Sequence, residues 1–407
     1  MLEDLRQQPA DPLLSVISMF AADSRPQRID LGVGVYRDEA GRTPVMRAVK
    51  AAELRLLTEQ ATKSYVGPSG DLEFLERLRG LIFGAGSADD RLVGLQTPGG
   101  TGALRAAADL MARGGIEGIW VGRPTWANHD PVLVAAGLTV RDYAYFDPVS
   151  QSVDFAAMTA AFESAERGDA VLLQAACHNP TGADLSIDQW REIAEIVSRR
   201  GLVPLIDVAY QGLGASLDGD MAGARTVLAA CGEALVAVSC SKSFGLYRER
   251  TGALFVLTAS PASRPKVQSN MLAIARANYS MPPDHGAAVV RIILSDNGLT
   301  EDWSNELRSM CARIQGTRRQ LARIGRLGPI DLSALGAQRG MFSLLPLNTE
   351  QIRILREEHA IYMAGSGRVN LAGLNAGDID ALVAGLTKVV AREDLRQPVD
   401  AVSLRPQ

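Results

Sequence analysis

A lysine follows a short apolar run in the segment Leu235–Gly252. The run 235–238 is short and partly β-branched, which predicts a buried strand ending just before Lys242. A desolvated amine has a lowered pKa and can attack a carbonyl carbon to form a Schiff base. A cation and hydroxyls suited to hold a phosphate lie close by, namely Ser239, Ser241 and Arg250. An amine beside a phosphate grip suggests pyridoxal phosphate, although this segment alone leaves a solvated lysine equally open.

A glycine-rich turn is the second candidate for anion binding. Thr97-Pro-Gly-Gly-Thr-Gly102 leads directly into a helical pattern from Ala103 to Ala112. The free backbone N–H groups at such a helix start, together with the helix dipole, favour an anion. Combined with Lys242 and Arg250, the turn becomes the second half of a phosphate site.

The elements that must position these residues alternate between residues 116 and 257. Short apolar runs are separated by helical patterns, which predicts an α/β fold with a mostly parallel sheet and helices on both faces. Ligands of open α/β sheets lie beyond the carboxyl ends of the strands. The polar or aromatic residues that follow the runs are Trp126, His129, Asn179, Asp207, Tyr210 and Lys242.

These strand-end residues suit one planar ligand when they are taken together. Trp126 can stack on a flat ring, and a buried Asp207 requires a cation. Tyr210 and Asn179 can both bond to one phenolate oxygen. Each residue alone has a structural interpretation as a cap, a turn or a core residue. A phosphorylated pyridine aldehyde uses all of them at once.

The amino-acid composition limits the classes of protein to which this chain can belong. The chain has 407 residues, 47% apolar and 22% charged, with a net charge of −4. This charge offers no case for binding nucleic acid or an acidic membrane. The four cysteines are scattered, which is typical of a reducing compartment, and we expect a cytoplasmic protein. The N-terminus does not have the pattern of a signal peptide, and no apolar run is long enough to span a membrane.

Four motifs in chain order resemble the aspartate/aromatic aminotransferase family. They are Thr97-Pro-Gly-Gly-Thr-Gly102, Cys177-His-Asn-Pro-Thr-Gly182, Ser239-Cys-Ser-Lys-Ser-Phe-Gly-Leu-Tyr-Arg-Glu-Arg250 and Ser366-Gly-Arg-Val-Asn370. The resemblance extends from about Pro12 to the C-terminus. It implies the fold of fold-type I pyridoxal-phosphate enzymes: a large domain with a mostly parallel seven-stranded sheet flanked by helices, and a smaller discontinuous α+β domain. The expected division is an arm and first part of the small domain (1–44), the large domain (45–309) and the rest of the small domain (310–407).

The resemblance also implies roles at the cofactor. Lys242 would hold pyridoxal phosphate and act as the base, while Asp207, with His129 behind it, would pair with the pyridine nitrogen. Tyr210 and Asn179 would bond the phenolate oxygen, and Trp126 would stack on the ring. The residues expected around the phosphate are Gly100, Thr101, Ser239, Ser241, Arg250 and, from the other subunit, Tyr65.

Substrate binding is implied in the same way. Arg368 would clamp the α-carboxylate, and Arg276 of a partner subunit would meet a side-chain carboxylate. Gly34 and Val33 would line the pocket, with Trp126 and Asn179 beside them. These assignments imply a homodimer with shared active sites.

Several positions depart from the pattern of the aspartate enzymes. Gln174 stands where many members have histidine, Ala175 and Ala176 replace a Gly-Cys pair, and Met281 replaces an asparagine near Arg276. The change at Met281 makes that corner more apolar, which favours tolerance of aromatic side chains.

The expected activity is therefore ping-pong exchange of an amino group between an aromatic amino acid, aspartate or both and 2-oxoglutarate. Two alternatives stay open. One is another fold-type I chemistry such as a lyase or decarboxylase, against which the paired clamps Arg276 and Arg368 argue. The other is a non-enzymatic regulator, which would need a basic DNA-binding module that neither end of this sequence provides.

Overall fold

The computed structural model describes residues 2–7, 12–84 and 89–392. Its centre is a seven-stranded sheet of order β2-β10-β9-β8-β7-β3-β4, in which β10 runs antiparallel to both neighbours and the other pairs are parallel. The mostly parallel sheet predicted from the sequence is thus confirmed. Its strands are β2 (Leu92–Pro98), β3 (Gly118–Arg123), β4 (Thr139–Ala144), β7 (Ala170–Gln174), β8 (Val203–Val208), β9 (Ala234–Ser239) and β10 (Thr251–Leu257).

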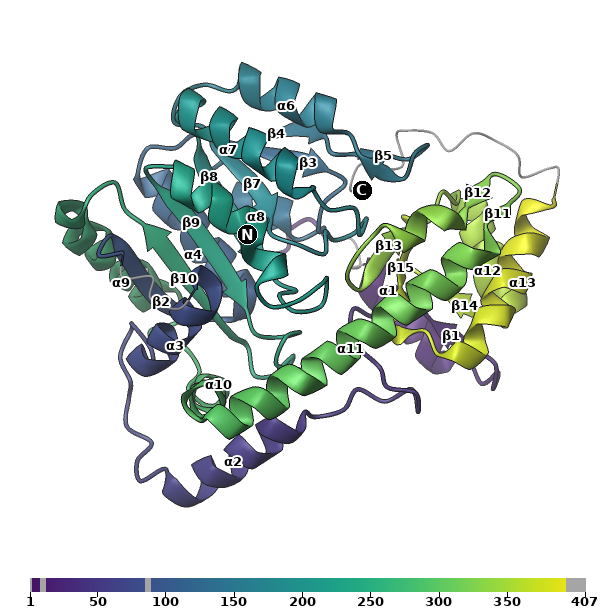
Figure 1. The fold of residues 1–407 in the computed structure, drawn as a ribbon, viewed down its shortest axis with the longest axis horizontal. Coiled ribbons are helices and arrows are strands. Elements are labelled where there is room, and N and C mark those ends of the chain that lie inside the picture. Colours follow the sequence, from purple (N-terminus) through teal and green to yellow (C-terminus); the bar gives the residue numbers. More distant parts are fainter. Residues whose placement is uncertain (1, 8–11, 85–88, 393–407) are drawn as a thin grey trace.

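Helices cover both faces of this sheet (Figure 1). Every residue of β9 and β10 is buried, as expected for strands that are covered on both sides. On one face lie α4 (Gly99–Arg113), α5 (His129–Ala135) and α9 (Arg264–Asn278). The other face carries α2 (Arg47–Glu59), α3 (Leu72–Phe83), α6 (Phe155–Ser164), α7 (Ile187–Arg200), α8 (Gly219–Ala230) and α10 (His285–Ser295), near the short hairpin of β5 (Phe146–Asp147) and β6 (Ser152–Val153).

The long helix α11 (Asn297–Ile324) leads from the large domain into a smaller α+β unit (Figure 1). This unit has its own apolar core. Its elements are β1 (Ile29–Asp30), β11 (Arg326–Leu327), β12 (Ile330–Asp331), β13 (Phe342–Leu344), α12 (Thr349–His359), β14 (Ile361–Tyr362), β15 (Arg368–Asn370) and α13 (Ile379–Val390).

The smaller unit is discontinuous in sequence, because β1 pairs in parallel with β14. The other pairs in it, β11 with β12 and β13 with β15, are antiparallel. The domain boundaries at residues 44/45 and 309/310 stay predictions, and α11 runs without a break across the second one.

Helix α2 has two exposed leucines, Leu54 and Leu57, at 64% and 82% exposure. One predicted helix start differs from the structure. The helix expected from Ala103 begins at Gly99, whose positive φ of 70° allows a sharp turn directly after β2. This earlier start places residues 99–102 of the glycine-rich turn in the first turn of α4, while Thr97 and Pro98 end β2.

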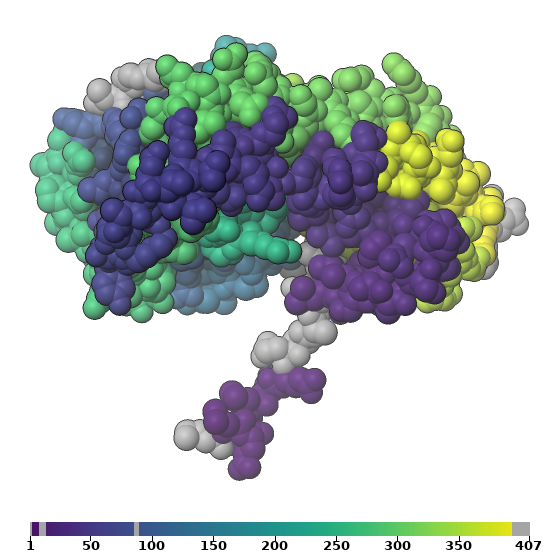
Figure 2. Space-filling model, turned by 90° about the horizontal axis from the view of Figure 1, so that it is seen from below, coloured from purple at the N-terminus to yellow at the C-terminus, as the bar shows by residue number. Residues whose placement is uncertain are grey.

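The N-terminal segment divides into two parts. Helix α1 (Pro12–Ala22) packs on the same chain, since the Phe20 ring lies edge-on to Tyr362 with centroids 5.5 Å apart. Residues 2–7 extend away from the body of the molecule (Figure 2), with Leu2 and Leu5 exposed. The predicted arm also includes residues 1 and 8–11, which lie outside the described residues. In the described part of the chain no helix is long and apolar enough to cross a membrane.

Candidate active site

Lys242 lies three residues beyond β9, where the chain turns back toward β10. Its ammonium nitrogen lies 5.0 Å from the centroid of the Tyr210 ring, and it forms no hydrogen bond or ion pair with the rest of the described chain. Burial, together with the smaller effects of the cations Arg250 and Arg368, lowers the pKa of Lys242 to about 8, against an opposing effect of Asp207. A substantial fraction of this amine is therefore neutral and nucleophilic near pH 8.

Asp207 ends a line of hydrogen bonds at the carboxyl edge of the sheet. It is buried on β8, and its Oδ2 lies 3.2 Å from Nε2 of the buried His129. The other imidazole nitrogen, Nδ1, lies 2.7 Å from the Thr125 hydroxyl. The Trp126 ring stands edge-on to His129, with centroids 5.3 Å apart. The carboxylate is thus held by one side chain and has capacity for a cationic ligand group.

Asn179 and Tyr210 form the opposite side of the cluster. The Asn179 amide nitrogen donates to the Tyr210 hydroxyl at 3.3 Å, and the Asn179 Oδ1 is buried without a hydrogen-bond partner. Burial raises the pKa of Tyr210, so this phenol stays protonated at neutral pH. An unpaired buried polar atom is costly, which indicates that this corner binds a polar ligand group.

The glycine-rich turn, Ser239 and Arg250 meet in a narrow cradle. A methyl group on Gly99 would lie 2.7 Å from the Arg250 guanidinium, and one on Gly100 would lie 2.9 Å from Cβ of Ser239. The strand register brings them together, because β10 pairs with β2 on one side and β9 on the other.

This cradle combines the start of α4, which includes Thr101, with a hydroxyl and a cation, and the Ser241 N–H donates to Ser239 Oγ at 3.3 Å. Helix N–H groups, hydroxyls and a guanidinium are the groups that bind a phosphate. The unpaired Asn179 oxygen, the amine of Lys242 and this cradle together fit pyridoxal phosphate.

The smaller unit contributes Arg368, which is directed toward the same cluster. Its guanidinium donates to the Gly32 carbonyl at 2.9 Å, stacks 4.6 Å from the Phe342 ring and has a buried Nε without a partner. Burial lowers the pKa of Arg368. Phe342 in turn stands edge-on to Tyr210, with centroids 6.1 Å apart. A buried guanidinium with an unpaired N–H is suited to bind a carboxylate.

Segment 32–35 closes this side of the site. A methyl group on Gly34 would lie 3.0 Å from the Phe342 ring, so a larger residue would have to displace that ring. The Asn370 amide holds the segment by donating to the carbonyl oxygens of Val33 at 2.5 Å and Val35 at 2.8 Å.

Two predicted residues do not reach this cluster within one chain. Tyr65 lies on the loop between α2 and α3 and is 92% exposed. Arg276 is exposed near the end of α9, and its guanidinium donates to the Ser280 hydroxyl. Neither side chain contacts Lys242 or Asp207 of the same chain in any described interaction, so both would serve this chemistry only across an interface.

Three contributors were not predicted as such from the sequence. The Thr125 hydroxyl forms a hydrogen bond with His129, and the Phe342 ring stacks against the Arg368 guanidinium. The Asn370 amide holds the segment around Gly34. Asn370 lies in a motif that the sequence marks, but its partner is distant in sequence, since Asn370 and Val35 are 335 residues apart. No local pattern could assign these contacts. Among the described residues no group of three His, Cys, Asp or Glu side chains could hold a metal ion.

The sequence matches the family aminotransferase class I and II over residues 26–386. It is 55% identical to the tyrosine aminotransferase of Rhizobium meliloti (strain 1021), with coverage of 96% of this chain and 100% of the relative. The aromatic-amino-acid aminotransferase of Paracoccus denitrificans is 45% identical and the aspartate aminotransferase of Escherichia coli (strain K12) 43%, each with the same coverage.

Solved structures agree with these relatives. An aromatic amino acid aminotransferase with 3-indolebutyric acid superimposes with a TM-score of 0.91 at 44% identity, covering 96% of this chain and 100% of that one. The aromatic-amino-acid aminotransferase from Burkholderia pseudomallei, described as covalently bound to pyridoxal phosphate, gives 0.91 at 38% identity, covering 96% and 99%.

The fold and the matched family and structures define a pyridoxal-phosphate enzyme of fold-type I. More particularly, the chain belongs to the aminotransferase class I and II family and is an amino acid transaminase.

Proposed function

We propose that this transaminase exchanges the amino group between an aromatic amino acid, aspartate or both and 2-oxoglutarate. The observation that carries the proposal is the buried Arg368 guanidinium, which has an unpaired Nε close to the Tyr210 and Lys242 cluster. This arrangement suits the α-carboxylate that every amino acid and 2-oxo acid substrate shares. The relatives named for tyrosine, aromatic amino acids and aspartate support the choice of substrate classes.

The residues of this chain would divide the work as follows. Bound pyridoxal phosphate supplies an aldehyde that captures the amine and a ring that withdraws electrons. Lys242 Nζ, neutral in a substantial fraction of molecules near pH 8, would hold the cofactor through its aldehyde carbon until the substrate amine displaces it. The freed amine would then act as the base that moves the substrate's α-proton from the α-carbon to the former aldehyde carbon. Asp207, oriented by His129, holds a cationic ring nitrogen.

The remaining residues hold and orient the reactants. Asn179 and Tyr210 bind the phenolate oxygen, and Trp126 covers the ring. Arg368 fixes the α-carboxylate beside Gly34 and Val33, which brings the α-proton within reach of Lys242. The phosphate is held by Gly100, Thr101, Ser239, Ser241 and Arg250.

A half-reaction experiment tests this proposal. Incubation of the holoenzyme with glutamate alone is expected to release one equivalent of 2-oxoglutarate per active site and then stop, because the amino group stays on the enzyme until an oxo acid arrives. Addition of phenylpyruvate or oxaloacetate should restart turnover. Continuous product formation with no oxo acid added would instead indicate a lyase or decarboxylase and contradict the proposal.

We further propose that the active unit is a homodimer with composite sites. The stretch of chain from just before α2 to the start of α3 exposes large apolar side chains. Exposed apolar groups gathered in this way are typical of an interface. They are Val45, Leu54, Leu57, Tyr65, Val66 and Leu72.

The cytoplasmic location predicted from the cysteines is also part of this proposal, supported by four buried free thiols.

A mixture of two inactive variants is expected to regain activity toward aspartate. In a hybrid of Lys242→Ala and Arg276→Ala subunits, one composite site has both mutations and the other has neither. Random pairing of equal amounts makes half of the dimers hybrid, so about a quarter of wild-type activity should return. The measurement is aspartate turnover after joint refolding, with each variant refolded alone as the control. A mixture no more active than the Arg276→Ala protein would contradict the shared site.

A further inference from the structure

Gln174 bridges two parts of the site that lie on different elements. It is the last residue of β7 and is paired in register with Asp207 of β8. Its side chain binds the backbone of Asn179 twice, accepting from the N–H at 2.8 Å and donating to the carbonyl at 3.1 Å. The same amide nitrogen lies 3.5 Å from the Thr125 hydroxyl.

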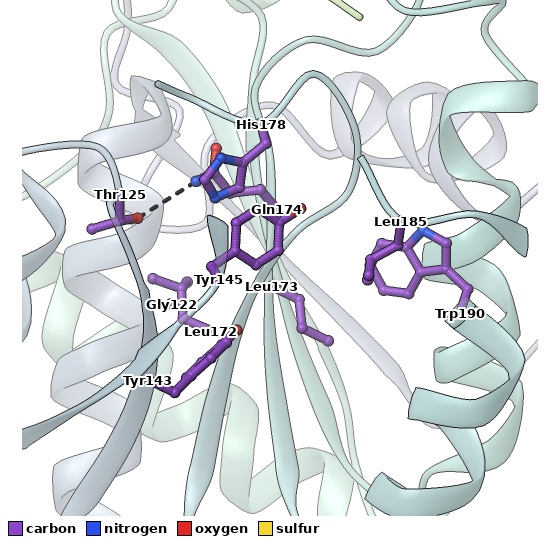
Figure 3. A pocket seen from close by; sticks show the side chains of 10 residues that line it. All are labelled: Gly122, Thr125, Tyr143, Tyr145, Leu172, Leu173, Gln174, His178, Leu185 and Trp190. Carbon is purple, nitrogen blue, oxygen red and sulfur yellow. Dashed lines mark hydrogen bonds between the residues drawn. The ribbon is translucent and has the colours of Figure 1, made fainter. Parts of the chain in front are cut away.

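The orientation of the Gln174 amide follows from these partners. A backbone N–H can only donate and a backbone carbonyl can only accept, so Oε1 must face the first and Nε2 the second. Nε2 carries two hydrogens, and the second points to Thr125, as the dashed line in Figure 3 shows. The Thr125 oxygen therefore accepts from Gln174.

The Thr125 hydroxyl in turn determines which way the hydrogen bond with His129 runs. The hydroxyl hydrogen has one acceptor within reach in the described part of the chain, the Nδ1 of His129 at 2.7 Å. If Nδ1 accepts this hydrogen bond, the imidazole of a neutral His129 carries its proton on Nε2. That proton points at Oδ2 of Asp207, 3.2 Å away.

A small cavity lies directly behind this line of residues. Its volume is about 10 Å³, room for roughly one water molecule, and Gln174, Thr125 and His178 line one end of it (Figure 3). Tyr145 stacks on His178 with ring centroids 4.0 Å apart, so aromatic side chains form much of the remaining wall.

We propose that Gln174 is a positioning residue that fixes the direction of the hydrogen-bond chain from the Asn179 backbone through Thr125 and His129 to Asp207. Its amide has one arrangement that satisfies its partners, and that arrangement selects the Nε2-protonated tautomer of His129. Asp207 then accepts the hydrogen bond from Nε2–H of His129 through its Oδ2. The consequence for catalysis rests on the proposed function, whereas the tautomer is a property of the protein alone.

The test is the tautomer of His129 in the apo and holo enzymes, measured by long-range ¹⁵N–¹H correlation of ¹⁵N-histidine-labelled protein. The chain has four histidines, and a His129→Gln variant assigns the resonance. The wild type is expected to show protonation at Nε2. In Gln174→Glu the introduced carboxylate attracts the Thr125 hydroxyl hydrogen, so Nδ1 loses its donor and should become protonated. The Gln174→Met variant keeps most of the side-chain volume but loses the amide. We expect it to show both tautomers of His129 and a fivefold to tenfold lower kcat/KM, roughly the effect of one hydrogen bond.

A matched pair at the next position tests the same chain if Gln174 variants fail to fold. Thr125→Ser keeps the hydroxyl and should keep the wild-type tautomer, whereas Thr125→Val should lose it. Persistence of the Nε2 proton in Gln174→Glu, Gln174→Met and Thr125→Val would overturn the inference, even if the wild type transaminates normally. If the tautomer changes as expected but the wild type fails the glutamate half-reaction, the inference about the chain stands and the proposed function fails.

Discussion

Replacement of Lys242 by alanine is expected to lower kcat at least about a thousandfold, because both a nucleophile and a general base are lost. The measurement is steady-state turnover with glutamate and an aromatic oxo acid. Thermal unfolding of the apo form separates this effect from misfolding. In the wild type the Lys242 ammonium has no hydrogen bond or ion pair with the described chain. Its removal should therefore leave the free energy of unfolding unchanged or raise it.

Lys50→Ala is the matched control for this experiment. Lys50 lies on the surface helix α2 and pairs with Glu53 at 3.4 Å, a contact that contributes little. We expect its activity to stay within about twofold of wild type, consistent with the small effects of such surface changes. A Lys242→Ala enzyme that retained turnover within about tenfold, which corresponds to about 1.4 kcal/mol in the barrier, would show that another group is the base.

The parts of the site that can be predicted from the sequence are those determined by residues close together in the chain. A short apolar run followed by Lys242 defines the end of β9, and a glycine-rich turn before a helix defines the start of α4. Parallel topology then brings strand ends to one edge of the sheet, which is why Asp207 and Asn179 can be grouped from residue order alone. The same reasoning predicts the fold class, because alternating runs and helical patterns are strong signals over such a length.

What could not be predicted depends on contacts between distant segments. Gly34 lies against the Phe342 ring, and Arg368 stacks on that same ring. No sequence pattern near either position predicts that both contact Phe342. The helix pattern predicts a start for α4 that is four residues too late, because propensity disfavours a helix that begins with two glycines. Here the positive φ of Gly99 and the close approach of Arg250 decide the local structure.

The direction of the network around Gln174 is a further example. The sequence shows that a glutamine replaces the histidine of many family members, but residue type alone cannot say which atom faces which partner. Only the two backbone contacts with Asn179 fix the amide and, through Thr125, the imidazole. Hydrogen-bond direction is thus a property of the assembled site.

Substrate choice is where Arg276 should have its largest effect. Aspartate, glutamate and 2-oxoglutarate carry a distal carboxylate that a partner's arginine can bind, whereas an aromatic side chain has none. A charge left unpaired beneath a ring would cost several kcal/mol. An enzyme that accepts both classes must therefore either let this arginine move or keep it solvated in a water-filled pocket. The exposed Arg276, whose guanidinium donates to the Ser280 hydroxyl and which precedes the half-buried Met281, is consistent with the first alternative.

Arg276→Leu is accordingly expected to lower kcat/KM for aspartate by about a hundredfold to a thousandfold, the effect of removing one partner of a charge pair. The value for phenylalanine should change by less than about tenfold, because no charge partner is lost. Both constants are measured on one preparation, with Arg264→Leu at the start of the same helix as the control. Equal losses for the two substrates would mean that Arg276 is structural. A wild-type preference beyond about a thousandfold for either amino acid, roughly 4 kcal/mol, would reject dual specificity and identify the preferred substrate class.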